Sequence, residues 1–150
     1  MKRLYILALC AALFAPVAAV SAPLDGSVKD WQYLPVIDKL NNTVTDSVVL
    51  FDQTGEAAIG LIKAMTEQPF IMFSSPNGEC YMHKSGGAIK FRVNDKVVAV
   101  TPAKVSGIYQ HAQLYDDKLM HDLSIAKSFI VRVQCIDAVR TYEFNVIKKG

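Results

Sequence analysis

The chain has 150 residues, of which 51% are hydrophobic and 20% charged, with 16 basic and 14 acidic residues. A near-neutral balance with interspersed signs gives no support for nucleic-acid binding, which needs a concentrated basic surface. The length suits one globular domain, and beyond the first residues no run is apolar and long enough to predict a transmembrane segment.

The first residues have the three parts of a secretory signal peptide. Lys2 and Arg3 form the positive start, and residues 4–15 form an apolar segment that is short for a membrane span. Small residues follow, so the sequence predicts cleavage near Ala19 to Ala22, with residues 1–21 as the signal peptide and 22–150 as one periplasmic or secreted domain. Without Lys2 and Arg3 the mature chain keeps 14 basic residues against 14 acidic ones and is formally neutral.

Two cysteines remain after the predicted cleavage, because Cys10 lies in the leader. An exported protein meets an oxidising compartment, so Cys80 and Cys135 are predicted to form a disulfide. This bond would close a loop of about 55 residues, which is worth about 4 kcal/mol of stability. The alternative is a pair of buried free thiols, and no Cys-x-x-Cys spacing points to a redox-active pair.

Short apolar or alternating segments, separated by turn residues, make up most of the mature chain. In the clearest of them, residues 88–93, apolar and charged side chains alternate, as is typical of a strand with one buried face. The segments that could form strands lie, in chain order, at residues 31–34, 47–52, 57–65, 69–74, 80–83, 88–93, 96–100, 107–114, 129–135 and 140–146.

Three segments give weaker signals. Residues 38–46 are rich in Asn, Thr and Asp and predict a loop, and residues 101–106, which include a proline, predict a connection. Residues 57–65 fit either a strand or two helical turns, because their apolar residues suit both and Gly60 weakens both. We favour a strand there, since a further strand follows closely.

One helix is predicted after the segment 107–114. Asp116 is a suitable N-cap residue, and Asp117 adds a second carboxylate near the positive end of the helix dipole. Leu119, Met120 and Leu123 form an apolar stripe about two turns long, a length that only packing can stabilise.

These elements predict a mainly β fold. About eight short strands, with turn signals about every 8 to 12 residues and one short helix, are typical of an antiparallel β-sandwich or a small barrel.

No residue pattern indicates catalysis, a metal site or a cofactor. His83, His111 and His121 have no established ligand spacing. Cys80 and His83 are three residues apart, so on one strand they would point to opposite faces rather than form a nucleophile–base pair. The chain has no Gly-x-Ser-x-Gly motif either.

The carboxylates are likewise predicted to have no catalytic role. The candidates for a carboxylate pair are expected at turns and strand ends, where a solvated side chain is the ordinary case, and they are Asp46, Asp52, Glu56 and Glu67. A surface of tyrosines is a further candidate for partner binding, since tyrosine is enriched in interfaces, although strand amphipathicity explains the same pattern.

Turn tips are the candidate partner-contact sites. Asn-Gly is a strong reverse-turn signal, and a Ser-Gly-Gly turn follows it shortly afterwards. An inhibitor would need such a protruding tip to enter the cleft of its target enzyme. The candidate contact residues are Asn77, Gly78, Ser85, Gly86, Gly87 and Tyr109.

Four segments of the C-terminal half carry a family resemblance. Residues 88–96, 117–123, 129–133 and 141–146 form a hairpin, a short helix, a strand and a closing strand in that order. This pattern resembles the type VI secretion-associated periplasmic proteins and, more loosely, the invasion-associated locus B proteins. The resemblance implies a periplasmic β-protein that acts as an envelope accessory without catalysis, and it transfers no functional residue.

The expected function is therefore protein binding in the periplasm. The first hypothesis is a non-enzymatic accessory of a bacterial envelope or secretion system, with another envelope or secreted protein as its partner. The second is a periplasmic inhibitor or immunity protein against a cell-wall hydrolase or toxin. The third, from a different class, is a small hydrolase.

Overall fold

A computed structural model of the chain describes residues 19–20, 24–38, 40, 43–64, 68–75, 80–83, 87–106 and 110–148. Within them the fold is mainly β, with two antiparallel sheets and one helix, α2, and the sheets do not close into a barrel. The predicted β-sandwich is confirmed. The described residues contain ten strands of three or more residues and two of only two residues, against the eight predicted.

Sheet A has eight strands in the order β1-β3-β4-β5-β6-β10-β9, with β2 also paired to β4. Its strands are β1 Ala19–Val20, β2 Gln32–Tyr33, β3 Val36–Asp38, β4 Thr43–Phe51, β5 Ala58–Ala64, β6 Phe70–Ser74, β9 Lys104–Ser106 and β10 His111–Leu114. Sheet B has four strands in the order β12-β11-β7-β8. They are β7 Ile89–Val93, β8 Lys96–Val100, β11 Ser128–Gln134 and β12 Val139–Asn145.

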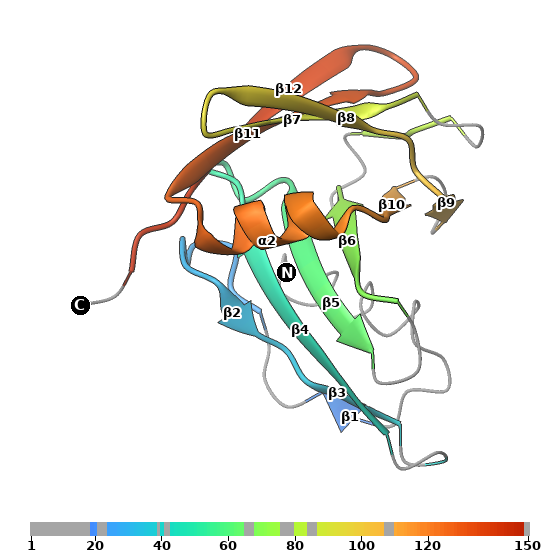
Figure 1. Cartoon of the computed structure of the whole chain (residues 1–150), viewed down its shortest axis with the longest axis vertical. Coiled ribbons are helices and arrows are strands. Elements are labelled where there is room, and N and C mark those ends of the chain that lie inside the picture. The colour runs from blue at the N-terminus through green and yellow to red at the C-terminus, as the bar shows by residue number, and fades with distance from the viewer. Residues whose placement is uncertain are drawn as a thin grey trace.

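The two sheets and the helix enclose one main core. In Figure 1 sheet B lies at the top, β4, β5 and β6 lie below it, and α2 crosses in front of β4 and β5. Phenylalanines from both sheets fill this space: Phe73 comes from sheet A, while Phe91 and Phe144 come from sheet B, and all three are fully buried. The Phe144 ring stacks on Phe129 with 4.8 Å between centroids.

Strand alternation decides which side chains enter that core. In β7, the apolar Ile89, Phe91 and Val93 are buried, while Lys90 and Arg92 between them are exposed. Successive residues of a strand point to opposite faces, so this pattern gives sheet B one apolar inner face and one polar outer face.

The turn between β7 and β8 has the backbone that a tight hairpin needs. Asn94 and Asp95 have φ values of 52° and 63°, which is the left-handed region. Both central residues of a type I′ turn lie there, and Asn and Asp tolerate it better than other residues that carry a side chain. The hairpin therefore forms without the glycine that commonly occupies such turns.

Sheet B joins two hairpins that are far apart in the sequence. β7 pairs with β11 through Arg92–Ile130, Phe91–Val131 and Lys90–Arg132. The strands between them, β9 and β10, belong to sheet A instead, where β10 pairs with β6. The chain thus leaves sheet B after β8 and returns to it only after α2.

Helix α2 spans Asp117–Ile125 and is capped as predicted. The Asp116 side chain accepts a hydrogen bond from the Leu119 backbone N–H at 2.8 Å. Leu119, Met120 and Leu123 are its buried residues, so the predicted apolar stripe is the face that packs on the core.

The turn between β4 and β5 is organised by one buried carboxylate. Asp52 is 1% exposed, and its Oδ1 accepts hydrogen bonds from the backbone N–H groups of Glu56 at 2.9 Å and Ala57 at 3.0 Å. Its Oδ2 accepts from the Thr54 hydroxyl at 2.7 Å. The expectation that Asp52 is solvated is therefore wrong, because the turn supplies enough donors to replace water.

Three segments differ from the sequence prediction. Residues 80–83 form no strand, because the Cys80 N–H donates to the Ser75 side chain and the Tyr81 carbonyl accepts from Ile136 instead of joining a ladder. The predicted connection 101–106 contains β9, which pairs with β10. The predicted loop 38–46 contains the start of β4, where β-branched residues favour an extended chain.

The predicted signal peptide lies mostly outside the described residues. Its described part, Ala19 and Val20, forms β1, which pairs with Ile37 and Val36 of β3. β3 also pairs with β4, so it has a second partner if the leader is removed. Among the described residues no helix is both long and apolar enough to cross a bilayer.

Candidate functional site

Most of the predicted partner-contact residues at the turn tips lie outside the residues that the structure describes. Asn77, Gly78, Ser85, Gly86 and Tyr109 are outside the described residues. Gly87 is described and exposed, and the position that its Cβ would take is 3.9 Å from the Cβ of Gln134. The tips remain a prediction, and Gly87 alone can be placed, beside the end of β11.

The predicted disulfide is confirmed. Cys80 and Cys135 are joined, with their Cα atoms 5.2 Å apart and both side chains fully buried. The bond ties the segment before β7 to the end of β11. A backbone hydrogen bond from Ile136 to the Tyr81 carbonyl, 2.7 Å long, lies directly beside it. Its burial and its position indicate a structural bond.

The structure does not gather the three histidines into one site. His83 is exposed, His111 is buried on β10, and His121 lies on the exposed side of α2. In the described part of the chain no group of three His, Cys, Asp or Glu side chains could hold a metal ion.

Buried His111 is expected to make the protein sensitive to mild acid. It is 6% exposed, and burial lowers its pKa from 6.5 to about 4, against a weaker opposing effect of the Gln110 backbone. The unfolded chain therefore takes up a proton below about pH 6.5, whereas the native chain does so only near pH 4. One pKa unit is worth about 1.4 kcal/mol, so we expect the free energy of unfolding to fall by up to about 3 kcal/mol as the pH drops through this window.

Urea unfolding of the wild type and His111→Gln at pH 7, 5 and 4 measures this effect. Carboxylates also titrate in this range, so the informative quantity is the difference between the two proteins. His111→Gln should show the smaller loss on acidification. Parallel pH profiles for both proteins would refute the expectation.

The tyrosines divide between core and surface. Tyr142 is 6% exposed and packs against Phe73 with ring centroids 5.6 Å apart. Tyr33, Tyr81 and Tyr115 are between 38% and 58% exposed. They lie on different elements, namely β2, the segment after Cys80, and the end of β10, so strand amphipathicity accounts for them better than a single aromatic patch.

The outer face of sheet B carries an unbalanced group of cations. Lys90 of β7 lies directly opposite Arg132 of β11, and Arg92 lies two residues along from Lys90 on the same face. All three side chains are exposed, and none of them forms an ion pair within the described residues. We call Lys90, Arg92 and Arg132 the basic face.

Few acidic groups stand near the basic face. Glu143, on β12, lies opposite Ile130, so it is a diagonal neighbour of Arg132 and two strands away from Arg92. Within the described residues it forms no ion pair with any of the three cations. Asp95 sits at the hairpin turn, beyond the end of β7. Within the described residues, the Arg132 side chain makes one hydrogen bond, a long one of 3.4 Å from its Nε to the Thr141 hydroxyl. The cations thus lack neutralisation at the edge of the sheet that β8 forms.

Strand β8 is an open edge beside that face. It pairs only with β7 among the described strands, and its Val97, which is 66% exposed, lies opposite Arg92. In a hairpin with a two-residue turn, the residues that flank the turn exchange both backbone hydrogen bonds and the next pair exchanges none. The backbone groups of Val97 and Ala99 therefore point away from β7, toward solvent.

The other edges are shorter or partly covered. Edge strand β9 of sheet A has only three residues. On β12, the opposite edge of sheet B, the Glu143 carbonyl accepts a hydrogen bond of 2.9 Å from Gln53, in the turn between β4 and β5. Just beyond β12, the Ile147 N–H donates to Lys29. β8 is thus the most available edge in the described part of the fold.

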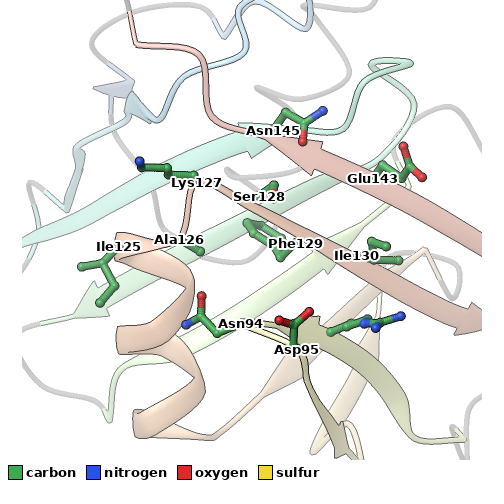
Figure 2. A pocket seen from close by; sticks show the side chains of 11 residues that line it. Asn94, Asp95, Ile125, Ala126, Lys127, Ser128, Phe129, Ile130, Glu143 and Asn145 are labelled. Carbon is green, nitrogen blue, oxygen red and sulfur yellow. The ribbon is translucent and has the colours of Figure 1, made fainter.

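A hollow adjoins the basic face at the end of sheet B. Its volume is about 550 Å³, and it lies where the connection from α2 to β11 passes the β7–β8 turn (Figure 2). It shares Arg92 with the basic face. It is lined by Arg92, Asn94, Asp95, Ile125, Ala126, Lys127, Ser128, Phe129, Ile130, Glu143 and Asn145. Charges of both signs meet there, so the hollow selects for no single type of ligand.

A second hollow, of about 490 Å³, lies between α2 and the strands β4 and β5. The Tyr33 hydroxyl donates to Asp46 at 2.5 Å, and this hydrogen bond raises the pKa of Tyr33. The Ser47 hydroxyl donates to the Leu34 carbonyl, and the Ser124 hydroxyl donates to a backbone carbonyl of its own helix. Among the described residues, neither hydroxyl donates to a base that could activate it.

No family model, curated protein or solved structure matches this chain. The resemblance to periplasmic secretion-associated proteins therefore stays a prediction. Sequence reasoning recognised the β7–β8 hairpin but not its role as a free edge, because strand order is not visible in the alternation of one strand.

Proposed function

We propose that the chain is a non-enzymatic protein-binding accessory of a bacterial envelope or secretion system, and that it binds its partner by strand addition at β8. The observation that supports this proposal is the open edge of β8. In strand addition, an extended segment of the partner pairs with an exposed edge, and main-chain hydrogen bonds supply much of the affinity.

The backbone of β8 has the donors and acceptors that this binding mode needs. The N–H and C=O groups of Val97 and Ala99 point outward, so a partner strand can pair with both residues. The Val97 side chain is already exposed, and it would lie against the partner's side chains on the outer face.

Devices that normally protect an edge strand are scarce in β8. Proteins blunt such edges with charged side chains, especially lysine, with proline, bulges or inward charges, or by keeping the strand very short. β8 contains no proline, pairs with β7 in unbroken register over five residues, and has a charge only at Lys96, beside the turn. An edge of this kind is a hazard unless a partner uses it, which favours a binding role.

The envelope location rests on two other features. The N-terminal segment has the pattern of a secretory signal, and the mature part carries a buried disulfide. Disulfides of this kind persist in oxidising compartments such as the bacterial periplasm.

Capture of partners from the organism's own envelope extract, with the mature oxidised chain as bait, tests the proposal. The decisive comparison is between the wild type and Ala99→Pro. Proline at residue 99 removes an N–H that points to solvent, so it spares the β7–β8 bonds but prevents pairing along the edge. We expect the true partner to be depleted at least tenfold with Ala99→Pro.

Thr141→Pro is the matched control. Thr141 lies on β12, the opposite edge, at a position whose N–H also points away from the sheet. It should retain the partner. If Ala99→Pro proves unstable, hydrogen exchange gives the same answer, because the Val97 and Ala99 amides of the wild type should gain protection only in the complex. Equal capture by all three proteins, or unchanged exchange, would contradict the proposal.

The identity of the captured protein distinguishes the two binding roles. A secretion or envelope component supports the accessory role. A cell-wall hydrolase or toxin, bound with one-to-one stoichiometry and inactive in the complex, identifies the chain as an inhibitor.

A further inference from the structure

We infer that the partner strand at β8 alternates acidic and apolar side chains, with the acidic ones on the outer face of sheet B. This inference rests on the proposed strand addition and names the chemistry of the partner. Two observations support it: the basic face, and the short side chains of Val97 and Ala99 that lie between this face and the open edge.

The register places the cations within reach of an added strand. Ala99 lies opposite Lys90, and Val97 lies opposite Arg92. A strand added to β8 would therefore lie two strand spacings, about 10 Å, from the backbone of β7. The side chains of Lys90 and Arg92 are long and exposed, and those of Ala99 and Val97 are too short to screen them. Glutamate side chains of the partner could thus meet the cations above β8.

The like charges within sheet B are a second reason. Lys90 and Arg132 are directly opposite each other on β7 and β11, and like charges in that position destabilise a sheet. Neither side chain has an ion-pair partner in the described part of the protein. An anionic side chain of the partner, placed beside Lys90, would offset this repulsion. Binding would therefore supply a counter-ion that the free sheet lacks.

The inner face of the added strand would meet apolar surface. Val98 is half-buried and packs against the main core, and Val100 is 9% exposed at its margin. Lys96 is on this face too, but it lies beside the turn, and the rest of the face is apolar. Residues of the partner beside Val98 and Val100 would continue the core outward, and a charged residue there would lose water without gaining a counter-ion. Acidic residues therefore belong on alternate positions only.

A second copy of this chain fits the same edge poorly. Pairing of β8 with β8 of another molecule would create one continuous sheet with both basic faces on the same side. Six cations would then share one surface, and that repulsion opposes association. Charge complementarity thus favours a different protein.

Three synthetic peptides provide the test. They alternate Val with Glu, Val with Gln, or Val with Lys. The affinity of each for the mature oxidised chain is measured by fluorescence anisotropy titration. We expect the Glu peptide to bind at least tenfold more tightly than the Gln peptide and the Lys peptide to bind most weakly. The preference for Glu should shrink at about 0.2 M salt, because these charges are exposed.

Two double variants locate the effect. Lys90→Ala with Arg92→Ala should reduce the affinity for the Glu peptide to that for the Gln peptide and leave the latter unchanged. Lys104→Ala with Lys148→Ala removes the same charge from exposed positions elsewhere and should keep the preference. Ala99→Pro should weaken binding of all the peptides, because it acts on the backbone.

The outcomes separate this inference from the function on which it rests. If Glu and Gln peptides bind equally and Ala99→Pro still abolishes binding, the charge rule is wrong and strand addition stands. If no peptide binds, or if Ala99→Pro has no effect, both fail. Sedimentation that shows a dimer lost on Ala99→Pro would replace the acidic partner with a second copy of the chain.

Discussion

The oxidised chain is expected to be about 4 kcal/mol more stable against unfolding than the double variant Cys80→Ala, Cys135→Ala. The two cysteines are separated by 55 residues, so their bond removes a large loop-closure entropy from the unfolded chain. Urea unfolding of both proteins measures the difference. The single tryptophan, Trp31, packs against the main core and reports the transition by its fluorescence.

Reduction of the wild type provides the matched control. A reducing agent breaks the bond and keeps both sulfur atoms in the core, so it isolates the cross-link from any cavity that Cys→Ala leaves. Reduced wild type should lie close to the double variant. Coincident unfolding curves for the oxidised and reduced wild type would rule out a stabilising role.

Replacing Asp52 with alanine is expected to lower the free energy of unfolding by about 3 kcal/mol. The change removes the acceptor for the Glu56 and Ala57 N–H groups and for the Thr54 hydroxyl. Ala57 is fully buried, so its N–H cannot turn to water instead. A buried donor left without a partner carries its whole desolvation penalty.

Asp52→Asn separates the hydrogen bonds from the charge. Its amide oxygen can still accept from Glu56 and Ala57, so this variant should lose less than half of the effect of Asp52→Ala. Guanidinium unfolding of the three proteins gives the ranking. A loss for Asp52→Asn as large as for Asp52→Ala would mean that the charge of Asp52, and not its hydrogen bonds to the turn, stabilises the protein.

Local chemistry made much of the fold predictable. The alternation in residues 88–93 and the turn at Asn94–Asp95 predicted the first hairpin of sheet B, and its register follows from the two-residue turn. The helix was predictable because Asp116 caps it and its apolar residues recur at helical spacing. Both elements depend on contacts within a few residues.

Tertiary contacts decided the segments that were mispredicted. β9 exists because β10 offers it a partner, and its own three residues, Lys104–Ser106, alternate over too short a length to predict a strand. Cys80 looked like part of a strand, but its N–H is satisfied by a side chain and its sulfur by a distant cysteine. Cys135 is too far along the chain for a local pattern to indicate it, and the nearer partners are not marked by any hydrophobic periodicity.

The candidate site was even less visible in the sequence. Lys90, Arg92 and Arg132 look like ordinary solvated residues of two strands until β7 and β11 are known to be neighbours. Strand order also decides that β8 is an edge. The partner loops were chosen from turn chemistry alone, and they are a separate prediction from this surface.

The pairing of β7 with β11 has a consequence for how the molecule matures. Cys80 lies before the first hairpin of sheet B and Cys135 follows β11, so their union requires the C-terminal hairpin to have docked. Long-range pairing of this kind forms slowly compared with local hairpins. A chain in which the last strands have not yet docked therefore still presents two free thiols. The accessibility of these thiols to a labelling reagent therefore reports, for each molecule, whether folding is complete.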